Sequence, residues 1–504
     1  MSAARSVPSV SLSIGGTEVE STLARTLFHV RVAMILSAPA QCEIRFLAPP
    51  QRAVTDRASP GRALELRVGG DPLFAGEVTA VEYVYNAERQ LELRVRAHDR
   101  LHRLQKRQSV RTFQTADVAT VARQLVSDLG IEVVATEAGP QWPYLIQAGQ
   151  SDHQLLVDLC ERAGLYFTLR DHECRFLSLE GQGSASESLT LGGTLLEATF
   201  EVNGASACRR IVAHGWDPLR ADVLAAEVQT ARSGRVVDAH VQPADVGAAD
   251  PRLLPGIADP TNEHAQAAAQ GVLDRLAARE VIARGVAEGN PSLRPGVSTS
   301  FEGVLSQIAG KYVLTEVVHT IDPQSGYLCC FSTEPPAPEP RSRATITTLA
   351  RISRVDDPQG LGRVRASLVA FGDAETDWMQ VASLGAGAKK GLMILPDTGD
   401  LVLVAFIHGD PAQGVVLGGL FGEVGASDPG VEGTEVRRFS LLTAGGNRLV
   451  LDDANRELRI ADATGSELTL SPNGVRLASK VPLTLDASGQ AMVFRANTID
   501  FERS

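Results

Sequence analysis

Two histidines four residues apart form the most suggestive chemical pattern in the sequence, His98-Asp-Arg-Leu-His102. On a helix, imidazoles at this spacing face one metal ion, as in the zincin motif HExxH. Here Asp99 stands where the general-base glutamate would be, and no third ligand is identifiable. Because a basic run follows, the segment fits a strand that exits into a solvated turn better than a metal-binding helix. We therefore predict no metal site here.

Two acid–histidine pairs and six cysteines are the other candidates for chemistry. Asp152-His153 and Asp171-His172 fall at expected cap or turn positions and lack a third partner for acid–base catalysis. The cysteines show no CxxC spacing and no nearby histidine, which is typical of reduced thiols in a protein made in the cytoplasm. We predict no catalytic residue, no cofactor and no metal. The six cysteines are Cys42, Cys160, Cys174, Cys208, Cys329 and Cys330.

The bulk composition favours a soluble protein with several domains. Of the 504 residues, 44% are hydrophobic and 21% are charged, which suits two to four domains with sizeable cores. A net charge of −12 argues against electrostatic binding of nucleic acid or anionic lipid. The apolar runs are too short for a transmembrane helix, and the first residues lead into strand-like alternation, so we expect no signal peptide.

Alternating apolar residues predict a mainly β protein in which a few helices interrupt small barrels. Residues 7–100 contain several short strand patterns separated by Pro and Gly, which is typical of a small barrel. Amphipathic patterns predict helices at 115–130, 151–164 and 261–287. The remaining residues up to 333 return to strand patterns, and the segment 221–260 shows no clear pattern.

The second half of the chain begins with a proline-rich boundary. Four prolines within residues 334–340 predict a stiff, extended linker. About five strand patterns follow, which suits an oligonucleotide/oligosaccharide-binding (OB) barrel. Its few aromatic residues, Phe371, Trp378 and Phe406, and its lack of a basic groove disfavour nucleic-acid binding.

These patterns divide the chain into six segments. The predicted domains are 1–100, the first part of a β-barrel; 101–180, a helix-containing subdomain; 181–333, a second β-barrel with the remaining region; 334–343, the linker; 344–425, an OB-fold barrel; and 426–504, a C-terminal β-helical segment.

The last sixty residues, 445–504, repeat one short strand and one turn about every eight residues. Each strand pattern has apolar residues two apart and hence one apolar face. A single ribbon has nothing in its own sequence to cover that face, whereas several copies wound around one axis bury it. The predicted core positions of such a multi-chain ribbon are Leu449, Leu451, Leu458, Ile460, Leu468, Leu470, Val475, Leu477, Leu483 and Leu485, followed by the pairs Met492/Phe494 and Ile499/Phe501.

Three stretches of the OB segment have a distinctive spacing of Asp, Gly, Pro and Arg. They are Asp356-Asp-Pro-Gln-Gly-Leu-Gly-Arg-Val-Arg365, then Trp378-Met-Gln-Val with Gly391-Leu-Met-Ile-Leu-Pro-Asp-Thr-Gly-Asp-Leu-Val-Leu-Val-Ala-Phe406, and finally the run from His408-Gly-Asp-Pro to Phe421. Together they resemble the VgrG-like spike proteins of extracellular, phage-tail-derived contractile injection systems, which are similar to fused phage tail hub and spike proteins. Leu401, where an acidic residue is usual, and Ala412 are small departures from the family pattern.

The flanking segments extend this resemblance to nearly the whole chain. The strand, Asp-Arg-Leu, helix and strand series at 91–179 is similar to the tail hub (late control protein D) part of these spikes. Gly164-Leu-Tyr-Phe resembles the R-x-G-x-x-F/Y motif of that part. Downstream, residues 444–452 resemble the G-x-x-L-x-x-D start of the spike β-helix.

The resemblance implies a non-enzymatic homotrimer. Its hubs (domains 1–100, 101–180 and 181–333) would form a pseudo-sixfold ring that adapts a sixfold tube to a threefold spike. Its OB modules (344–425) would form a collar, and its C-terminal ribbons (426–504) an intertwined trimeric β-helix or β-prism, the spike, that punctures a target membrane. The implied partners are the inner tube protein, baseplate wedge proteins, a PAAR-like tip protein and effector cargo. Such a protein would be made in the cytoplasm, assembled into a contractile particle, and in some systems released outside the cell.

Two alternative functions fit the sequence less well, and the end of the ribbon adds one expectation. A spike that carries an effector or enzyme domain would need more residues than lie between Phe421 and Gly445 or after the ribbon. An OB-type carbohydrate or nucleic-acid binder is disfavoured by charge and by aromatic content. Residues 497–504 contain no histidine, so the HxH iron site of some spike tips is excluded. We expect Ile499 and Phe501 to form a blunt face that docks a separate tip protein.

Overall fold

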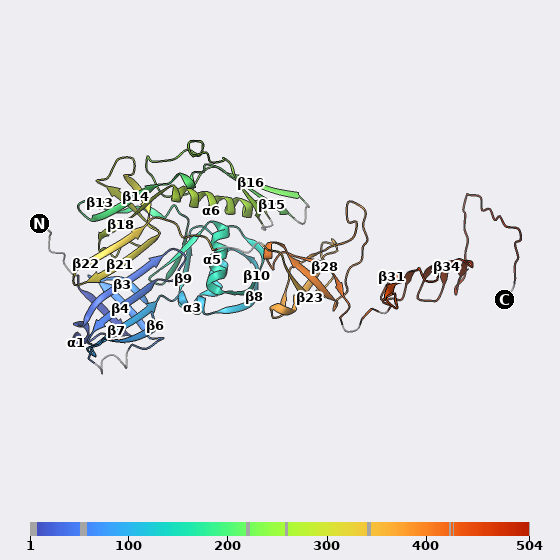
Figure 1. Cartoon of the computed structure of the whole chain (residues 1–504), viewed down its shortest axis with the longest axis horizontal. Helices are drawn as coiled ribbons and strands as arrows, with labels where there is room; N and C mark the ends of the chain where they lie inside the picture. Colours follow the sequence, from blue (N-terminus) through green and yellow to red (C-terminus); the bar gives the residue numbers. More distant parts are fainter. Residues whose placement is uncertain are drawn as a thin grey trace. The chain divides into compact units, whose positions relative to one another are not determined.

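The computed structural model describes residues 8–50, 58–217, 222–257, 261–339, 344–422, 425–426 and 428–502. Two compact units divide the chain, Met1–Gly419 and Leu420–Ser504, and each is described by itself. Strands predominate in both units, which confirms the prediction of a mainly β protein (Figure 1). No helix among the described residues is long and apolar enough to cross a membrane.

One eleven-stranded sheet forms the framework of the first unit. Its strand order is β14-β18-β22-β21-β3-β4-β7-β6-β5-β1-β2. Antiparallel pairing of β3 with β21 joins the strands of residues 10–98 to those of residues 195–332, so these two predicted hub segments share one sheet. The strands are β1 (Val10–Ile14), β2 (Thr17–Glu18), β3 (Leu27–Ile35), β4 (Gln41–Leu47), β5 (Ala63–Val68), β6 (Asp71–Tyr85), β7 (Leu91–His98), β14 (Leu195–Val202), β18 (Val281–Glu288), β21 (Glu316–Asp322) and β22 (Gly326–Ser332), with the short helix α1 (Ser21–Ala24) after β2.

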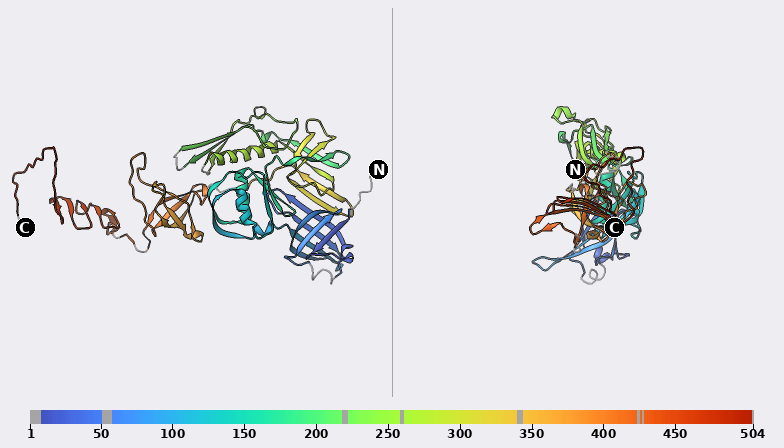
Figure 2. Two further views of the ribbon diagram at one scale, coloured as in Figure 1. Left: turned by 180° about the vertical axis from the view of Figure 1, so that it is seen from behind. Right: turned by 90° about the vertical axis from the view of Figure 1, so that its right-hand side faces the viewer.

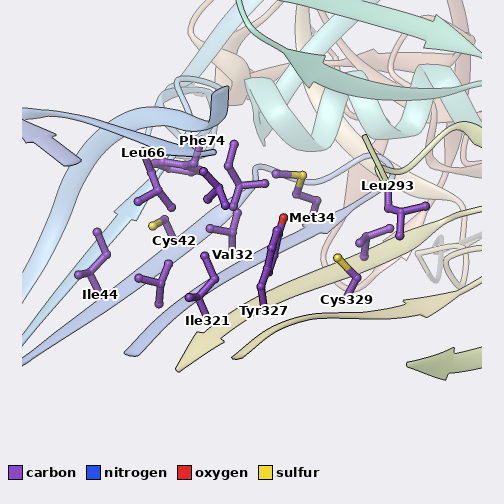
Figure 3. Close-up of a cluster of buried hydrophobic side chains, with 14 of the residues drawn as sticks. Val32, Met34, Cys42, Ile44, Leu66, Phe74, Leu293, Ile321, Tyr327 and Cys329 are labelled. Carbon is purple, nitrogen blue, oxygen red and sulfur yellow. The ribbon is translucent and has the colours of Figure 1, made fainter. Parts of the chain in front are cut away.

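The core of this sheet draws on both of these segments. Alternate residues of β3 and β4 are buried, including Val32, Cys42 and Ile44. The same cluster contains Tyr327 and Cys329 of β22, about 300 residues further along the chain (Figure 3). Alternate residues of these strands are therefore buried, as the sequence pattern predicts. The core that they form, however, is shared between segments far apart in the sequence.

Two smaller sheets and one long helix complete this lobe. Helix α6 (Asn262–Glu280) packs its alanine-rich face, including Ala265, Ala269 and Leu273, on the sheet β16-β15-β17 (Figures 1 and 2). The expected helix over 261–287 is wrong in its last turns, because β-branched Val281 and Ile282 pair into β18 between two neighbouring strands. The other elements are β13 (Gln182–Thr190), β15 (Ile211–Asp217), β16 (Asp222–Val228), β17 (Arg252–Ile257), β19 (Val297–Glu302), β20 (Gly310–Val313), η1 (Gly204–Ser206) and η2 (Pro243–Val246).

The helical subdomain lies between the two halves of the large sheet in sequence. Helix α5 (Asp152–Ala163) starts with a capping box at Ser151 and ends at Gly164, whose φ of 68° suits a residue without Cβ. Helix α4 (Val118–Leu125) is capped by Asp117 and is shorter than the predicted 115–130. The remaining elements are α3 (His102–Gln105), β8 (Gln108–Ala116), β9 (Glu132–Ala135), β10 (Trp142–Ser151), β11 (Tyr166–Arg170) and β12 (Glu173–Leu177).

The OB module closes the first unit as a six-stranded sheet in the order β25-β24-β23-β27-β28-β26. An isolated bridge joins Val364, just before β24, to Met379, just before β26, and so brings the last strand of that order back to β24. Phe406, Val402 and Val416 are buried in its core. The elements are β23 (Ile346–Arg354), β24 (Arg365–Leu368), η3 (Val369–Phe371), β25 (Ala374–Glu375), β26 (Gln380–Val381), β27 (Leu401–Phe406), η4 (Ile407–Gly409) and β28 (Gly414–Leu420).

The second unit is a ribbon of short antiparallel strands. Five of them form a meander, β31 (Arg438–Leu442), β32 (Arg448–Asp452), β33 (Glu457–Ala461), β34 (Glu467–Ser471) and β35 (Gly474–Ala478), after the hairpin of β29 (Val431–Glu432) and β30 (Glu435–Val436). The strands expected at 483–485, 491–494 and 498–501 are absent from the described residues 479–502. A strand needs a hydrogen-bonding neighbour, and Pro482 lacks the N–H to pair with the edge of β35.

Candidate functional site

The register of the five-stranded meander places ten apolar side chains on one face. Directly paired residues of adjacent strands point to the same side of a sheet, and so do residues two apart within a strand. The pairs Leu451↔Leu458 and Leu449↔Ile460 are typical of the whole meander. Two parallel rows result: Phe439, Leu451, Leu458, Leu470 and Val475 form one, and Leu441, Leu449, Ile460, Leu468 and Leu477 form the other. We call these ten residues the apolar face of the ribbon.

This apolar face is open to solvent in the single chain. Phe439 is 57% exposed and Val475 is 73% exposed, whereas core leucines of the large sheet such as Leu64 are 0% exposed. Within the described residues of this unit, Ala461 is the only buried apolar side chain, and it lies on the opposite face. The ribbon therefore has an apolar surface but no core of its own, which is typical of an interaction surface.

The opposite face of the ribbon is polar. Arg459 lies between Val450 and Thr469 in the cross-strand register and pairs with Glu467 at 2.5 Å. The turns are held by side chains, as where the Asp462 carboxylate accepts hydrogen bonds from the backbone N–H groups of Thr464 and Ser466, both at 2.9 Å. The ribbon thus has one apolar and one polar face, and hydrogen bonds from side chains hold its turns.

The structure places eight of the ten predicted spike-core residues on this face. Leu483 and Leu485 lie outside any strand and are 56% and 59% exposed. Ile499 and Phe501, the predicted docking residues, also lie outside strands, and Phe501 is 94% exposed. Sequence periodicity missed Phe439 and Leu441, although both continue the same alternation one strand earlier.

The His98–His102 pattern has a structural explanation. His98 ends β7 and His102 begins α3, with ring centroids 6.0 Å apart, and the His102 Nδ1 donates to the carbonyl of Asp99 at 2.7 Å. The Asp99 carboxylate accepts from the N–H groups of Ala40 and Leu101 at 2.7 and 2.9 Å, and its burial raises its pKa to about 7. Asp99 thereby ties the end of β7 to the start of β4. Among the described residues, no group of three or more metal-binding side chains is placed to hold an ion.

The acid–histidine pairs also serve the fold. The buried Asp152 carboxylate begins α5 and accepts hydrogen bonds from Arg111 and from Gln147, neither of which the sequence singled out. His153 packs edge-on against the Phe167 ring at 5.9 Å. Asp171 has a φ of 58° in the turn between β11 and β12.

One buried cluster brings together groups that sequence spacing did not connect. The His319 Nδ1 lies 2.9 Å from the Tyr327 hydroxyl and 3.1 Å from the Cys329 sulfur, while its Nε2 donates to the carbonyl of Leu293 at 3.0 Å. Burial raises the pKa of Cys329 to about 12 and lowers that of His319 to about 3. A neutral thiol and a neutral imidazole pack here as core groups rather than as a nucleophile and base. All six cysteines are free thiols, and only Cys330 is exposed.

The first motif of the OB module is a loop closed by an ion pair between Asp357 and Arg363. The Asp357 carboxylate receives two hydrogen bonds from the Arg363 guanidinium, at 2.8 and 3.0 Å, and further ones from the N–H groups of Gln359 and Leu361. These bonds, led by Arg363, hold the pKa of Asp357 well below its usual range. The motif Asp-Pro-Gln-Gly-Leu-Gly-Arg is therefore a closed loop, with Asp357 as its anchor.

The ring of Trp378 is not free to stack on a ligand. The guanidinium groups of Arg354 and Arg365 lie 5.5 and 5.2 Å from its centroid, and each arginine is paired in turn with an aspartate.

The OB module is packed onto the helical subdomain. Tyr144 and Ile146 of β10 belong to the hydrophobic cluster of the OB core, and the Tyr144 hydroxyl donates to the carbonyl of Glu375 at 2.6 Å. Arg162 at the end of α5 lies 3.5 Å from Asp410 of the module. No local sequence pattern indicates this joint, because its partners are more than 200 residues apart.

Two family matches cover most of the chain. Residues 35–325 match the phage tail baseplate hub (GPD) family, and residues 348–421 match the type VI secretion system/phage-baseplate injector OB domain. A comparison with curated protein sequences found no match.

Solved structures with a similar fold come from phage tails and secretion systems. The E. coli c3393 protein, described as a component of the type VI secretion system that resembles the T4 tail proteins gp27 and gp5, is 14% identical, with 81% of this chain and 99% of that one covered and a TM-score of 0.52. A chain of the Francisella PdpA–VgrG complex is 7% identical, with coverage of 93% and 87% and a TM-score of 0.53. The 43 kDa tail protein of prophage MuSo2 from Shewanella oneidensis is 15% identical, with coverage of 65% and 98% and a TM-score of 0.51.

Proposed function

This chain belongs to the phage tail baseplate hub family, and from that membership we propose that it is the homotrimeric hub and spike at the distal end of the inner tube of a contractile injection system. A structural role as a baseplate hub of VgrG type is supported by both family matches and by the shared fold. Trimer formation, the change from sixfold to threefold symmetry and membrane puncture are the proposed refinements.

The apolar face of the ribbon is the observation that carries the proposal. Ten aliphatic or aromatic side chains in two rows have no cover in one chain, and identical rows on other copies are complementary in chemistry and in spacing. Three ribbons that each supply one wall enclose these rows in a prism. Because the side chains are already about half shielded, their full burial stabilises the assembly by on the order of 10 kcal/mol per chain.

The remainder of the ribbon completes the prism differently. Residues 479–502 alternate in apolarity, with pairs such as Met492/Phe494, but form no strand in the single chain. Pro482 and the absence of a tight turn after Ala478 prevent this segment from folding back on β35 as a hairpin. We therefore propose that β31–β35 are walls formed within one chain, and that the later segments, with Leu483 and Leu485, pair between chains.

The proposed hub ring follows from the shared sheet of the first unit. Each copy contributes two groups of strands, one from residues 10–98 and one from residues 195–332, joined by β3 and β21. Three copies would then present six similar groups to a sixfold tube. Tyr144, Ile146 and Arg162 connect the hub to the OB module, so that force on the hub reaches the collar.

The proposed partners are those of an injection particle. They are the inner tube protein, baseplate wedge proteins, a PAAR-like tip protein against Ile499 and Phe501, and effector cargo, since a solved VgrG with this fold is in complex with PdpA. The protein would be made in the cytoplasm, assembled into the particle and driven through a target membrane. No enzymatic step is required of this chain in that role.

The solution mass of the purified full chain tests the proposal. A species of three times the 53.5 kDa chain mass supports it, whereas a monomer or a dimer overturns it. No specific observation favours an enzyme carrier or an OB-type glycan binder over this function.

A further inference from the structure

The sequence contains two Asn-Gly steps, Asn203-Gly204 and Asn473-Gly474. At such a step the backbone nitrogen of the glycine is a nucleophile toward the carboxamide carbon of the asparagine, because glycine has no Cβ to hinder the approach. The reaction needs an asparagine side chain that is free to turn toward the following peptide, space for the ring that forms, and an accessible glycine nitrogen. The structure gives the two steps opposite surroundings.

The surroundings of Asn203 hold its side chain in place. Its Oδ1 accepts a hydrogen bond from the backbone N–H of Ala205 at 2.9 Å, and its Nδ2 donates to Glu201 Oε1 at 3.1 Å. A Cβ placed on Gly204 would lie 2.8 Å from the Cγ1 of Val246, so this step has no room for a ring. We therefore expect Asn203 to be inert in the folded chain.

The second step lies in the turn between β34 and β35. Asn473 is exposed, and its carboxamide forms no hydrogen bond with any residue that the structure describes. Its backbone N–H donates to the hydroxyl of Ser471 at 3.3 Å, which holds the turn but leaves the side chain free. A Cβ placed on Gly474 would have no atom of a non-neighbouring residue within 4 Å. The Asn473 side chain can therefore turn toward Gly474 and close a ring without a steric clash.

The nitrogen of Gly474 belongs to an edge strand with little packing. β35 pairs with β34 alone, and Ser471↔Gly474 is the last pair of their ladder. β35 has no buried side chain, since Val475 is 73% exposed and Leu477 is 56% exposed. Because opening the end of such a strand breaks few contacts, its amides are released at little cost in free energy. The Gly474 nitrogen is thus accessible to the Asn473 carboxamide.

We propose that Asn473 is a site of spontaneous covalent modification, at which the Asn473-Gly474 step rearranges to isoaspartate or aspartate through a succinimide. The Gly474 nitrogen forms a bond to Cγ of Asn473, and the carboxamide nitrogen leaves as ammonia together with the proton that the Gly474 nitrogen loses. Water then opens the ring. Hydrolysis at the main-chain carbonyl leaves the chain running through Cγ, as isoaspartate, whereas hydrolysis at Cγ gives aspartate. Water is the only other reactant that these steps need.

Isoaspartate changes the length of the turn. The main chain then passes through the former Asn473 side chain and is one methylene longer between Ser471 and Gly474, the two residues that the turn pairs. The length of so short a turn fixes the strand register, so the longer chain displaces β35 from β34. Val475 and Leu477, which end the two rows, would leave the apolar face. The reaction takes place within one chain and does not depend on the proposed trimer.

Peptide mapping of the full-length chain tests this inference. The folded protein is kept at neutral pH, sampled over time and digested with trypsin, and mass spectrometry measures the amide-to-acid conversion of both asparagines in the same sample. We expect Asn473 to convert at least about tenfold faster than Asn203 in the folded chain, and at a similar rate in urea, where the chain is unfolded. Asn473→Gln is the matched control, because glutamine would have to close a larger, less favourable ring. The tryptic peptide 460–476 of this variant should keep its mass.

Conversion of Asn473 no faster than that of Asn203 in the folded chain overturns the proposed modification. Hydrogen–deuterium exchange then tests the displacement of β35. We expect amides of residues 475–478 to exchange faster in the isoaspartate-containing chain than in Asn473→Gln treated in the same way. Equal exchange, or a product that is only aspartate, overturns the displacement. A monomeric wild type, which would overturn the proposed function, leaves both expectations unchanged.

Discussion

The hydroxyl of Tyr144 donates a 2.6 Å hydrogen bond to the backbone carbonyl of Glu375, 231 residues further along the chain. Tyr144 lies on β10 of the helical subdomain, and Glu375 ends β25 of the OB module. With Ile146 inserted in the OB core, this bond makes a packed joint rather than a hinge between hub and collar. A structure that transmits axial force requires such a joint.

Weakening this joint should loosen the OB module without unfolding the hub. Tyr144→Phe removes one buried hydrogen bond and should cost about 1 kcal/mol of unfolding free energy, and Ile146→Ala should cost about 2–4 kcal/mol through lost packing. Calorimetry of the full chain should show the OB transition shifted to lower temperature. The control Tyr85→Phe, at a side chain that is 65% exposed, should change nothing measurable. Equal effects of Tyr144→Phe and Tyr85→Phe would contradict the joint.

The stability of the first OB motif should depend on one of its two adjacent aspartates. Asp357 is the anchor that accepts from Arg363 and from backbone N–H groups, whereas the neighbouring Asp356 pairs with the exposed side chain of Arg354. Asp357→Asn should lower the melting temperature of the module by several degrees, because Arg363 loses its carboxylate partner. Asp356→Asn is the matched control, with little expected effect. An equal shift in melting temperature for both variants would show that the stability of this loop does not depend specifically on Asp357.

Burial of His319 predicts an acid-sensitive hub. In the folded chain its pKa is lowered to about 3, whereas the unfolded chain takes up the proton near the ordinary value of about 6.5. Protons therefore favour the unfolded state as pH falls from 6.5 to 3, and stability that is fully present above 6.5 is lost across that window.

The contribution of His319 is measurable as the slope of the unfolding free energy against pH. His319→Gln should reduce the loss of unfolding free energy on acidification by up to about 1.4 kcal/mol per pH unit between pH 6 and 4, at the cost of lower stability at pH 7. Urea titrations at a series of pH values measure this. The exposed His240→Gln serves as the control and should leave the slope unchanged. An unchanged slope in His319→Gln would show that buried His319 does not cause the acid sensitivity.

The end of the ribbon should act in docking and not in trimer formation. Phe501 is 94% exposed and lies outside the strands of the meander. Phe501→Asp should weaken binding of a purified PAAR-like tip protein at least tenfold, because a charge replaces the apolar contact, while the mass of the spike stays unchanged. Surface plasmon resonance with immobilised spike measures the affinity. Undiminished tip binding would show that this pair is not the docking surface.

Local patterns predicted much of this molecule because they depend on neighbours in sequence. The period of two placed Leu449, Leu451, Leu458 and Ile460 on one face, and the Ser151 cap with Gly164 bounded α5 to within one residue. The Asp357–Arg363 loop also closes within seven residues, so its motif could be recognised without a structure.

Long-range pairing accounts for what the sequence could not show. The union of β3 with β21, the contact of His319 with Cys329 across a shared core and the Tyr144 joint depend on which distant strands meet. The sequence pattern predicts a helix at Val281 and Ile282 because the preceding residues are helical, yet both belong to strand β18 of the large sheet. Residues 483–501 have strand-like alternation but no partner strand in a single chain, so local pattern alone was insufficient to place them.

The native mass of the full chain and of two ribbon variants tests the central claim most directly. Leu458→Asp/Leu470→Asp places two charges at a directly paired position of the apolar face, whereas Thr469→Asp changes the polar face of the same strand. Analytical ultracentrifugation should find the wild type and Thr469→Asp at three times 53.5 kDa and the double variant at the mass of one chain. A monomeric wild type, or a double variant that remains trimeric, would contradict a spike held together by this face.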